Sequence, residues 1–326
     1  MPTPGLAEIC RIAFGDRTAA RMVVHPDDPP AVRWMAAVAL GGRGRYGAAY
    51  ALLERIVRSP SAPDAIRAHA AITRASHLRQ LGGHRWARRW DGLGLSFSST
   101  ALAGSARLGP AQPGSGPPGT AWPGRSPGTT PLAQGDPDRM GFDAAAARVD
   151  ALLGLAADAL GLAELDLASR LLTDVERCAY EHPSWRPRVR LRWIRAELAL
   201  ALDDPGQAQE HAERALEASR DAGAVRHEVK SELVLLVARS CLGEPAAQLS
   251  DELEALSERA SAARLDSLEW PMRLLLTRTF RPAHPVRSTR HATRYHELLT
   301  GIGRATDPFG RMMLARSPWV LVDHGP

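Results

Sequence analysis

The chain has 326 residues, of which 44% are hydrophobic and 24% charged, with a formal net charge of +5 and a sequence pI near 9.6. This length allows two average domains or one long array of repeats, and the composition is that of a globular protein. No stretch approaches the roughly 18 apolar residues of a membrane-spanning helix. Glu8, Arg11 and Asp16 interrupt the apolar core that a signal peptide needs, so we expect a cytoplasmic protein.

Arginine supplies nearly all of the positive charge, since Lys230 is the only lysine, and asparagine is absent. Alanine, arginine, glycine and proline are abundant, as in proteins from GC-rich bacterial genomes. A basic protein can bind nucleic acid or an anionic membrane. Here the arginines are spread along the chain, which is more typical of a solvated surface than of a stripe that follows phosphates.

Apolar residues recur at helical spacing through the first part of the chain. The clearest pattern predicts two helices that fold back on each other across the turn Gly41–Gly44. Prolines separate this hairpin from the elements before and after it, because proline ends one helix and suits the first turn of the next. The expected helices are 5–24, the hairpin 31–57, and a second hairpin made of 64–81 and 84–95.

The pattern stops between Ser96 and Asp138, where Pro, Gly, Ser and Thr replace the large aliphatic residues. Such a segment cannot bury enough apolar surface to offset the entropy of ordering it, so we expect a disordered linker or insert. Asp143 is a good N-cap for the helix that follows. Three further hairpins are expected: Val149–Leu160 with Ala168–Val175, Leu191–Leu202 with Ala208–Ser219, and Val229–Ser240 with Leu249–Ala263.

Two more helices are expected at 268–280 and 287–302, followed by a tail of turn and coil. No convincing alternation of apolar and polar residues predicts a strand, so the expected fold is all-α. The domain organisation predicted from these patterns is 1–95 for the N-terminal hairpins, 96–140 for the linker, 141–304 for the C-terminal repeats and 305–326 for the coil tail.

The hairpins resemble tetratricopeptide repeats, a family with small residues inside each hairpin and a glycine and an aromatic residue at its turn. Small residues let the two helices approach, and large ones fill the space between hairpins. The resemblance implies an α-solenoid interrupted by the linker. The first hairpin matches with Ala37, Gly44, Tyr46, Ala49 and Leu53, and the second with Ala75, Gly82 and Ala87.

The resemblance also implies a concave groove that holds a peptide or another protein, lined by the first helix of each hairpin. The family's clamp for a C-terminal carboxylate uses Lys, Arg and Asn, and without asparagine it cannot be complete here. A groove with arginines and tryptophans would still favour an acidic or aromatic ligand. The positions that map to the groove are Trp34, His69, Arg79, Arg190, Trp193 and Lys230.

The motifs of common catalytic and nucleotide-binding sites are absent from the sequence, and we expect no cofactor and no metal site. The predicted function is therefore non-catalytic binding of a protein or peptide, by a scaffold or regulator. Two alternatives stay open. Trp185 and Trp193 flank an arginine-rich stretch that would suit nucleic acid. Lys230, alone of its kind, would suit an enzyme with an amine nucleophile.

Overall fold

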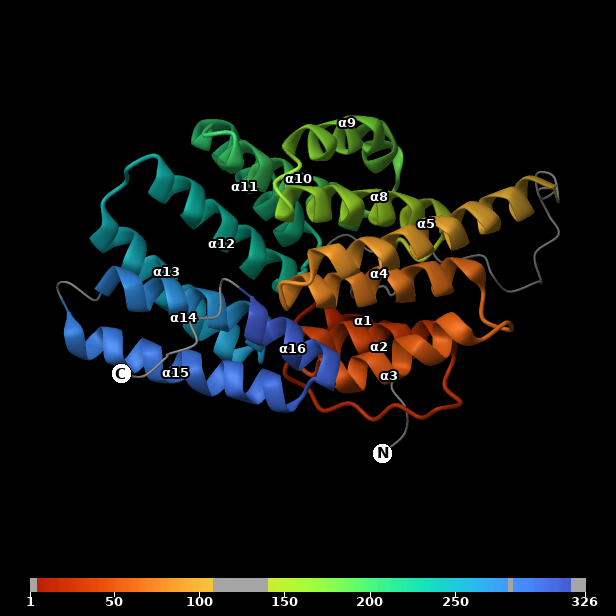
Figure 1. The fold of residues 1–326 in the computed structure, drawn as a ribbon, viewed down its shortest axis with the longest axis horizontal. Coiled ribbons are helices and arrows are strands. Elements are labelled where there is room, and N and C mark those ends of the chain that lie inside the picture. Colours follow the sequence, from red (N-terminus) through yellow and green to blue (C-terminus); the bar gives the residue numbers. More distant parts are fainter. Residues whose placement is uncertain (1–4, 108–139, 281–283, 318–326) are drawn as a thin grey trace.

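The computed structural model describes residues 5–107, 140–280 and 284–317, and these residues form fourteen α-helices and no strand. The all-α hairpin array predicted from the sequence is confirmed. The helices, labelled as in Figure 1, are α1 (Leu6–Ala13), α2 (Pro30–Gly42), α3 (Tyr46–Arg58), α4 (Asp64–Gln80), α5 (His84–Arg107), α8 (Ala144–Gly161), α9 (Leu165–Glu181), α10 (Trp185–Ala201), α11 (Pro205–Asp221), α12 (Val225–Cys241), α13 (Ala246–Ala262), α14 (Asp266–Phe280), α15 (Pro285–Arg304) and α16 (Pro308–Arg316).

From α2 onward the helices pair as antiparallel hairpins, α2 with α3 through α14 with α15, and each hairpin packs on the next. Amphipathic stripes cause this arrangement. In α9 the buried residues Ala168, Leu172, Val175 and Ala179 recur every three or four positions, while the opposite face is polar. The hairpin α4–α5 packs directly on α8, so the helices before and after residues 108–139 belong to one array.

The two ends of the array are in contact (Figure 1). At the start of α3 the Gly47 amide donates to the carbonyl of Ala305, which follows α15, at 2.8 Å. Tyr46 shares a core cluster with Leu299 and Ile302 of α15. The opening hairpin, which has the clearest repeat pattern in the sequence, therefore packs against the last helices of the array, and the array closes on itself.

Two boundaries expected in the first third of the chain are wrong, the end of the first helix and the start of the linker. The first helix, expected over 5–24, ends at Ala13. Just beyond this end, Asp16 accepts a hydrogen bond of 2.9 Å from Nε of Arg11 to its Oδ1. The linker expected from residue 96 does not begin there, because α5 continues to Arg107. The hydroxyls of Ser98 and Ser99 donate to backbone carbonyls of the same helix, so a polar stretch that reads as linker satisfies its own hydrogen bonds. The remainder of the expected linker, 108–139, lies outside the described residues.

The expected coil tail is also wrong over its first half, where Pro308–Arg316 form α16. Asp307 caps this helix by accepting from the Gly310 amide at 2.6 Å, and its other oxygen accepts from Arg74 of α4. Phe309 packs edge-on against Trp86 at 5.3 Å between ring centroids. This short helix therefore depends on tertiary contacts with α4 and α5, which a local pattern does not reveal.

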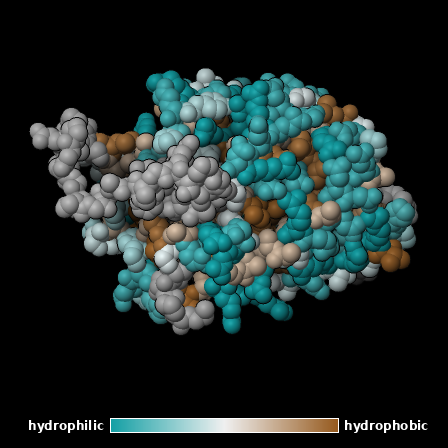
Figure 2. Space-filling model, turned by 180° about the vertical axis from the view of Figure 1, so that it is seen from behind, coloured by the Kyte–Doolittle hydropathy of each residue, from teal (hydrophilic) through white to brown (hydrophobic). Residues whose placement is uncertain are grey.

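Across the described part of the chain, no helix combines the length and the apolar character needed to cross a bilayer. The face seen from behind is predominantly hydrophilic, with hydrophobic side chains in small separate patches (Figure 2). Small patches of this kind are normal on a protein surface and do not by themselves indicate a docking face.

Two glycines on facing helices allow a test of the packing between α5 and α8. A Cβ atom at Gly154 would overlap the Asp91 carboxylate, whereas a Cβ atom at Gly92 would meet nothing. Alanine favours a helix over glycine by roughly 1 kcal/mol. We therefore expect Gly92→Ala to raise the free energy of unfolding by up to about 1 kcal/mol and Gly154→Ala to lower it. Urea denaturation measures both, and equal effects of the two substitutions would contradict this packing.

Candidate functional site

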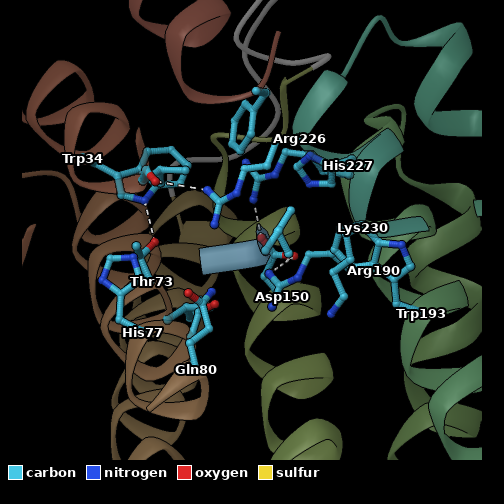
Figure 3. A pocket seen from close by; sticks show the side chains of 16 residues that line it. Trp34, Thr73, His77, Gln80, Asp150, Arg190, Trp193, Arg226, His227 and Lys230 are labelled. Carbon is cyan, nitrogen blue, oxygen red and sulfur yellow. Dashed lines mark hydrogen bonds and ion pairs between the residues drawn. The ribbon is translucent and has the colours of Figure 1, made fainter. Parts of the chain in front are cut away.

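A pocket of about 150 Å³ opens between the first helices of successive hairpins. A second pocket, of about 260 Å³, shares Ser76, Gln80, Arg190, Trp193 and Lys230 with it, so the two form one continuous depression. We call this depression the inner cleft. Its walls come from α2, α4, α8, α10 and α12 (Figure 3), the helices that the repeat resemblance assigns to the groove.

Aromatic and imidazole rings form much of the cleft wall. Trp34 lies on the α2 side, and its indole N–H donates to the Thr73 hydroxyl at 2.8 Å. Trp193 lies across the cleft on α10 and donates to the Ser231 hydroxyl at 2.8 Å. His227 stacks on Trp193 at 5.0 Å between centroids. The hydrogen bonds fix both indoles, so the cleft presents rigid aromatic surface.

The main charged centre of the cleft is the buried carboxylate of Asp150 on α8. Arg190 of α10 contacts it at 2.6 Å, and Arg186, one turn earlier, donates to its other oxygen. Burial alone would raise the pKa of Asp150, but Arg190 and Arg186 hold it below the usual value. The carboxylate and two guanidinium groups thus form a compact buried triad with a net charge of +1, in which both guanidinium groups already contact a carboxylate.

Two further cations reach the cleft from α12. The ammonium of Lys230 lies 3.2 Å from the Glu197 carboxylate and 4.6 Å from the centroid of the Trp193 ring. Arg226, one turn earlier, donates from Nη1 to the carbonyl of Val38 at 3.0 Å. Among the described residues no carboxylate pairs with Arg226, and burial lowers the pKa of its guanidinium. Arg226 is therefore a cation at the cleft wall without a counter-charge.

Two histidines on α4 belong to the packed interior. His69 stacks on Trp34 at 4.4 Å between centroids, and His77 packs against Tyr46 at 5.3 Å. Burial, reinforced by nearby arginines, lowers the pKa of each imidazole to about 3. Both rings are therefore neutral at physiological pH, which fits their role as packing groups in the wall of the cleft.

Arg79 is held by buried groups of neighbouring helices. Its guanidinium donates to Asp91 of α5 and, at 3.2 Å, to Asp158 of α8, both of which are fully buried. A third bond of 3.3 Å reaches the Gly154 carbonyl. Burial raises the pKa of Asp91 to about 7, and the second carboxylate adds to the rise while Arg79 opposes it. Arg79 thus joins three helices at the bottom of the cleft.

The structure brings together five of the six residues predicted for the groove, and their role in binding stays a prediction. His69 is the exception, since its ring lies behind Trp34, contacts the Asp143 carbonyl and does not line either pocket. The residues that line the cleft are Trp34, Arg79, Arg190, Trp193 and Lys230.

Sequence reasoning missed Arg226, Arg186 and Asp150 in this cleft. Arg226 could have been found, because it precedes Lys230 by four residues and so shares its helix face. Asp150 could not, because its partners on α10 are distant in sequence and only packing brings them together.

In sequence comparisons no protein-family model matches the chain, and no curated protein matches it. One solved structure with a similar fold is described as "Crystal Structure of Rap Protein Complexed with Competence and Sporulation Factor". The match has a TM-score of 0.51 and 10% sequence identity, and it covers 87% of this chain and 69% of that chain. At this identity the likeness concerns the fold alone, and it agrees with a helical-repeat architecture.

Replacing Arg79 tests whether its role is structural. Arg79→Gln leaves the carboxylates of Asp91 and Asp158 buried without their cation, so we expect the free energy of unfolding to fall by roughly 3–5 kcal/mol. Adding Asp91→Asn to that variant removes one of the orphaned charges and is expected to recover part of the loss. Denaturant unfolding measures both, and an Arg79→Gln protein of unchanged stability would show that the contact is dispensable.

The buried imidazoles predict a loss of stability in mild acid. The unfolded pKa of histidine is about 6.5, so below that pH the unfolded chain binds protons that folded His69 and His77 do not. The free energy of unfolding then falls by about 1.4 kcal/mol per pH unit for each imidazole. Asp91 opposes this trend, because its raised pKa makes the folded state take up one proton in the same range.

Urea unfolding measured near pH 7 and near pH 5 gives this slope directly. His77→Gln is expected to flatten it by about 1.4 kcal/mol per pH unit, since one proton-binding difference is removed. His25→Gln is the matched control for the loss of one histidine, because His25 is exposed in the loop before α2 and does not pack in the interior. Equal slopes for the unmodified protein and the His77 variant would refute the assignment.

Proposed function

We propose that this protein is a non-catalytic binding protein whose inner cleft takes a segment of another protein or a peptide. The observation that carries the proposal is the composition of the cleft wall. Successive repeats place fixed indoles and basic side chains along one continuous depression (Figure 3). Indole and guanidinium groups supply much of the affinity in protein recognition, because they combine large contact area with directed hydrogen bonds.

The comparison with the solved structure adds support of a limited kind. That structure has a similar fold and is described as a Rap protein complexed with Competence and Sporulation Factor. A fold of this kind can therefore accommodate a bound factor. We extend this to a role as scaffold or regulator in the bacterial cytoplasm, for which the amino-acid composition is the further support.

The surroundings of Lys230 argue against the enzyme alternative. The ammonium contacts both Glu197 and the face of Trp193, and each contact is an attraction to a cation. A nucleophilic lysine needs a neutral amine, which a dry apolar site or a neighbouring cation promotes. We therefore assign Lys230 to ligand recognition.

The nucleic-acid alternative receives less support from the distribution of charge. Many of the arginines are bound to carboxylates of the same chain, as in the pairs Arg195–Glu176, Arg239–Glu252 and Arg259–Glu232. A phosphate backbone is recognised by cations that are available to it. Steep loss of heparin or single-stranded DNA binding with rising salt would favour this alternative.

The cleft can be tested with an array of random peptides and purified protein. We expect the unmodified protein to select a subset of peptides, and Trp193→Leu or Lys230→Gln to weaken these interactions about tenfold or more, since both side chains line the cleft. Arg188→Gln serves as control, because Arg188 is on α10 but lines a different pocket. Retained binding by both cleft variants would rule out this site, and fluorescence anisotropy measures the affinities.

A further inference from the structure

The cations of the inner cleft differ in whether a carboxylate of this chain contacts them. Arg186 and Arg190 share Asp150, Arg79 holds two buried carboxylates, and Lys230 contacts Glu197. Arg226 has no such partner among the described residues. A guanidinium at a partly buried wall loses hydration, and the single bond to the Val38 carbonyl does not compensate its charge as an anion would.

We propose that Arg226 anchors a carboxylate of the bound ligand, so that the cleft selects an acidic side chain or a C-terminal carboxylate. This inference rests on the proposed function, since it names the chemical class of the segment that the cleft takes. It differs from the expectation based on sequence, in which Arg79, Arg190 and Lys230 supply the positive charge that attracts an acidic ligand.

Two hydrogen bonds hold Arg226 in a fixed position. Its backbone N–H donates to the Phe14 carbonyl at 3.1 Å, and its Nη1 donates to the Val38 carbonyl at 3.0 Å. Gly42 lies beside the guanidinium, where a Cβ atom would be 3.5 Å from it. A guanidinium has five N–H donors, and the Val38 bond is its one hydrogen bond to the described residues, so a fork of donors is left for a carboxylate.

The surroundings of Arg226 complete the carboxylate site. Lys230 lies one turn farther along the same face of α12 and adds a second positive charge (Figure 3). Four cations and one carboxylate line the 150 Å³ pocket in the described residues, and Asp150, the carboxylate, is covered by Arg186 and Arg190. Trp193 is partly exposed and offers apolar ring surface on one side, and Trp34, which is 1% exposed, forms part of the opposite wall. A cavity of roughly this volume can hold a benzene-sized group, so an aromatic carboxylate is a suitable probe.

The first experiment uses benzoate and its neutral isostere benzamide, with the eight indole N–H signals read by ¹H–¹⁵N NMR. We expect benzoate to shift the Trp34 and Trp193 signals in a saturable way and benzamide to do so at least tenfold more weakly, because a charged hydrogen bond is lost. Equal effects of benzoate and benzamide would overturn the proposal, as would the absence of any shift with benzoate.

Substitutions at Arg226 assign the effect to this residue. Arg226→Gln is expected to weaken benzoate binding at least tenfold, and Arg226→Lys to weaken it less, since lysine keeps the charge but not the planar fork. The lysine variant also serves if the glutamine variant fails to fold. Arg188→Gln is the control for loss of one positive charge on a different pocket. Unchanged benzoate affinity in both Arg226 variants would overturn the proposal.

A comparison of peptides distinguishes an acidic side chain from a C-terminal carboxylate as the group that is bound. It also distinguishes the carboxylate site from the proposed peptide-binding function. Peptides with an internal Asp or Glu, peptides with a free C-terminus and their amidated or neutral counterparts are compared on the same array. Preference for either carboxylate form, lost in Arg226→Gln and reduced in Arg226→Lys, supports the inference and names the source. Neutral peptides that bind the cleft equally well would refute it while the proposed function stands. Benzoate binding through Arg226 without any peptide binding would refute the proposed function and leave the anion site.

Discussion

The contact of Arg79 with Asp91 and Asp158 is the constraint on which the arrangement of the array depends. It joins α4, α5 and α8, and thereby connects the helices that precede residues 108–139 with those that follow. Two carboxylates in a dry interior repel each other, so the geometry holds only where one guanidinium reaches both and the backbone comes close enough. Gly154 allows this close approach. A buried network of this kind adds less to net stability than to the choice of one arrangement over others.

Ion pairing within the chain also decides which charges of the inner cleft are available to a ligand. Most cations of the inner cleft contact a carboxylate of the chain, and this makes them less available to an anionic ligand than Arg226 even though they line the site. Asp150 fixes Arg186 and Arg190 as a wall between α8 and α10, and Glu197 holds Lys230 at the rim. Arg226 differs because its contacts are with backbone carbonyls and with glycine. The proposed selectivity for a carboxylate therefore depends on Arg226, which no carboxylate of the described residues contacts.

The fold could be predicted from the sequence to the extent that it depends on local periodicity. The stripe of Ala168, Leu172 and Val175 identifies α9, and the small residues of the opening hairpin identify its packing. The errors in the predicted helix boundaries arose where side-chain hydrogen bonds within a helix, or tertiary contacts, override local composition. Ser98 and Ser99 look like linker residues but bond to their own helix, and the last helix, Pro308–Arg316, depends on an aspartate cap and on contacts with α4 and α5.

The sequence by itself determined an all-α array of hairpins and the helices that would face its interior, because burial of one apolar stripe per helix requires that periodicity. It also pointed to Trp193 and Lys230 as side chains of the cleft. Only the tertiary structure decided that the two ends of the array meet, that His69 lies behind Trp34, and that no carboxylate of the described residues contacts Arg226. The physical reason is that pairing between charges depends on distances between segments remote in the chain, and no local pattern encodes those distances.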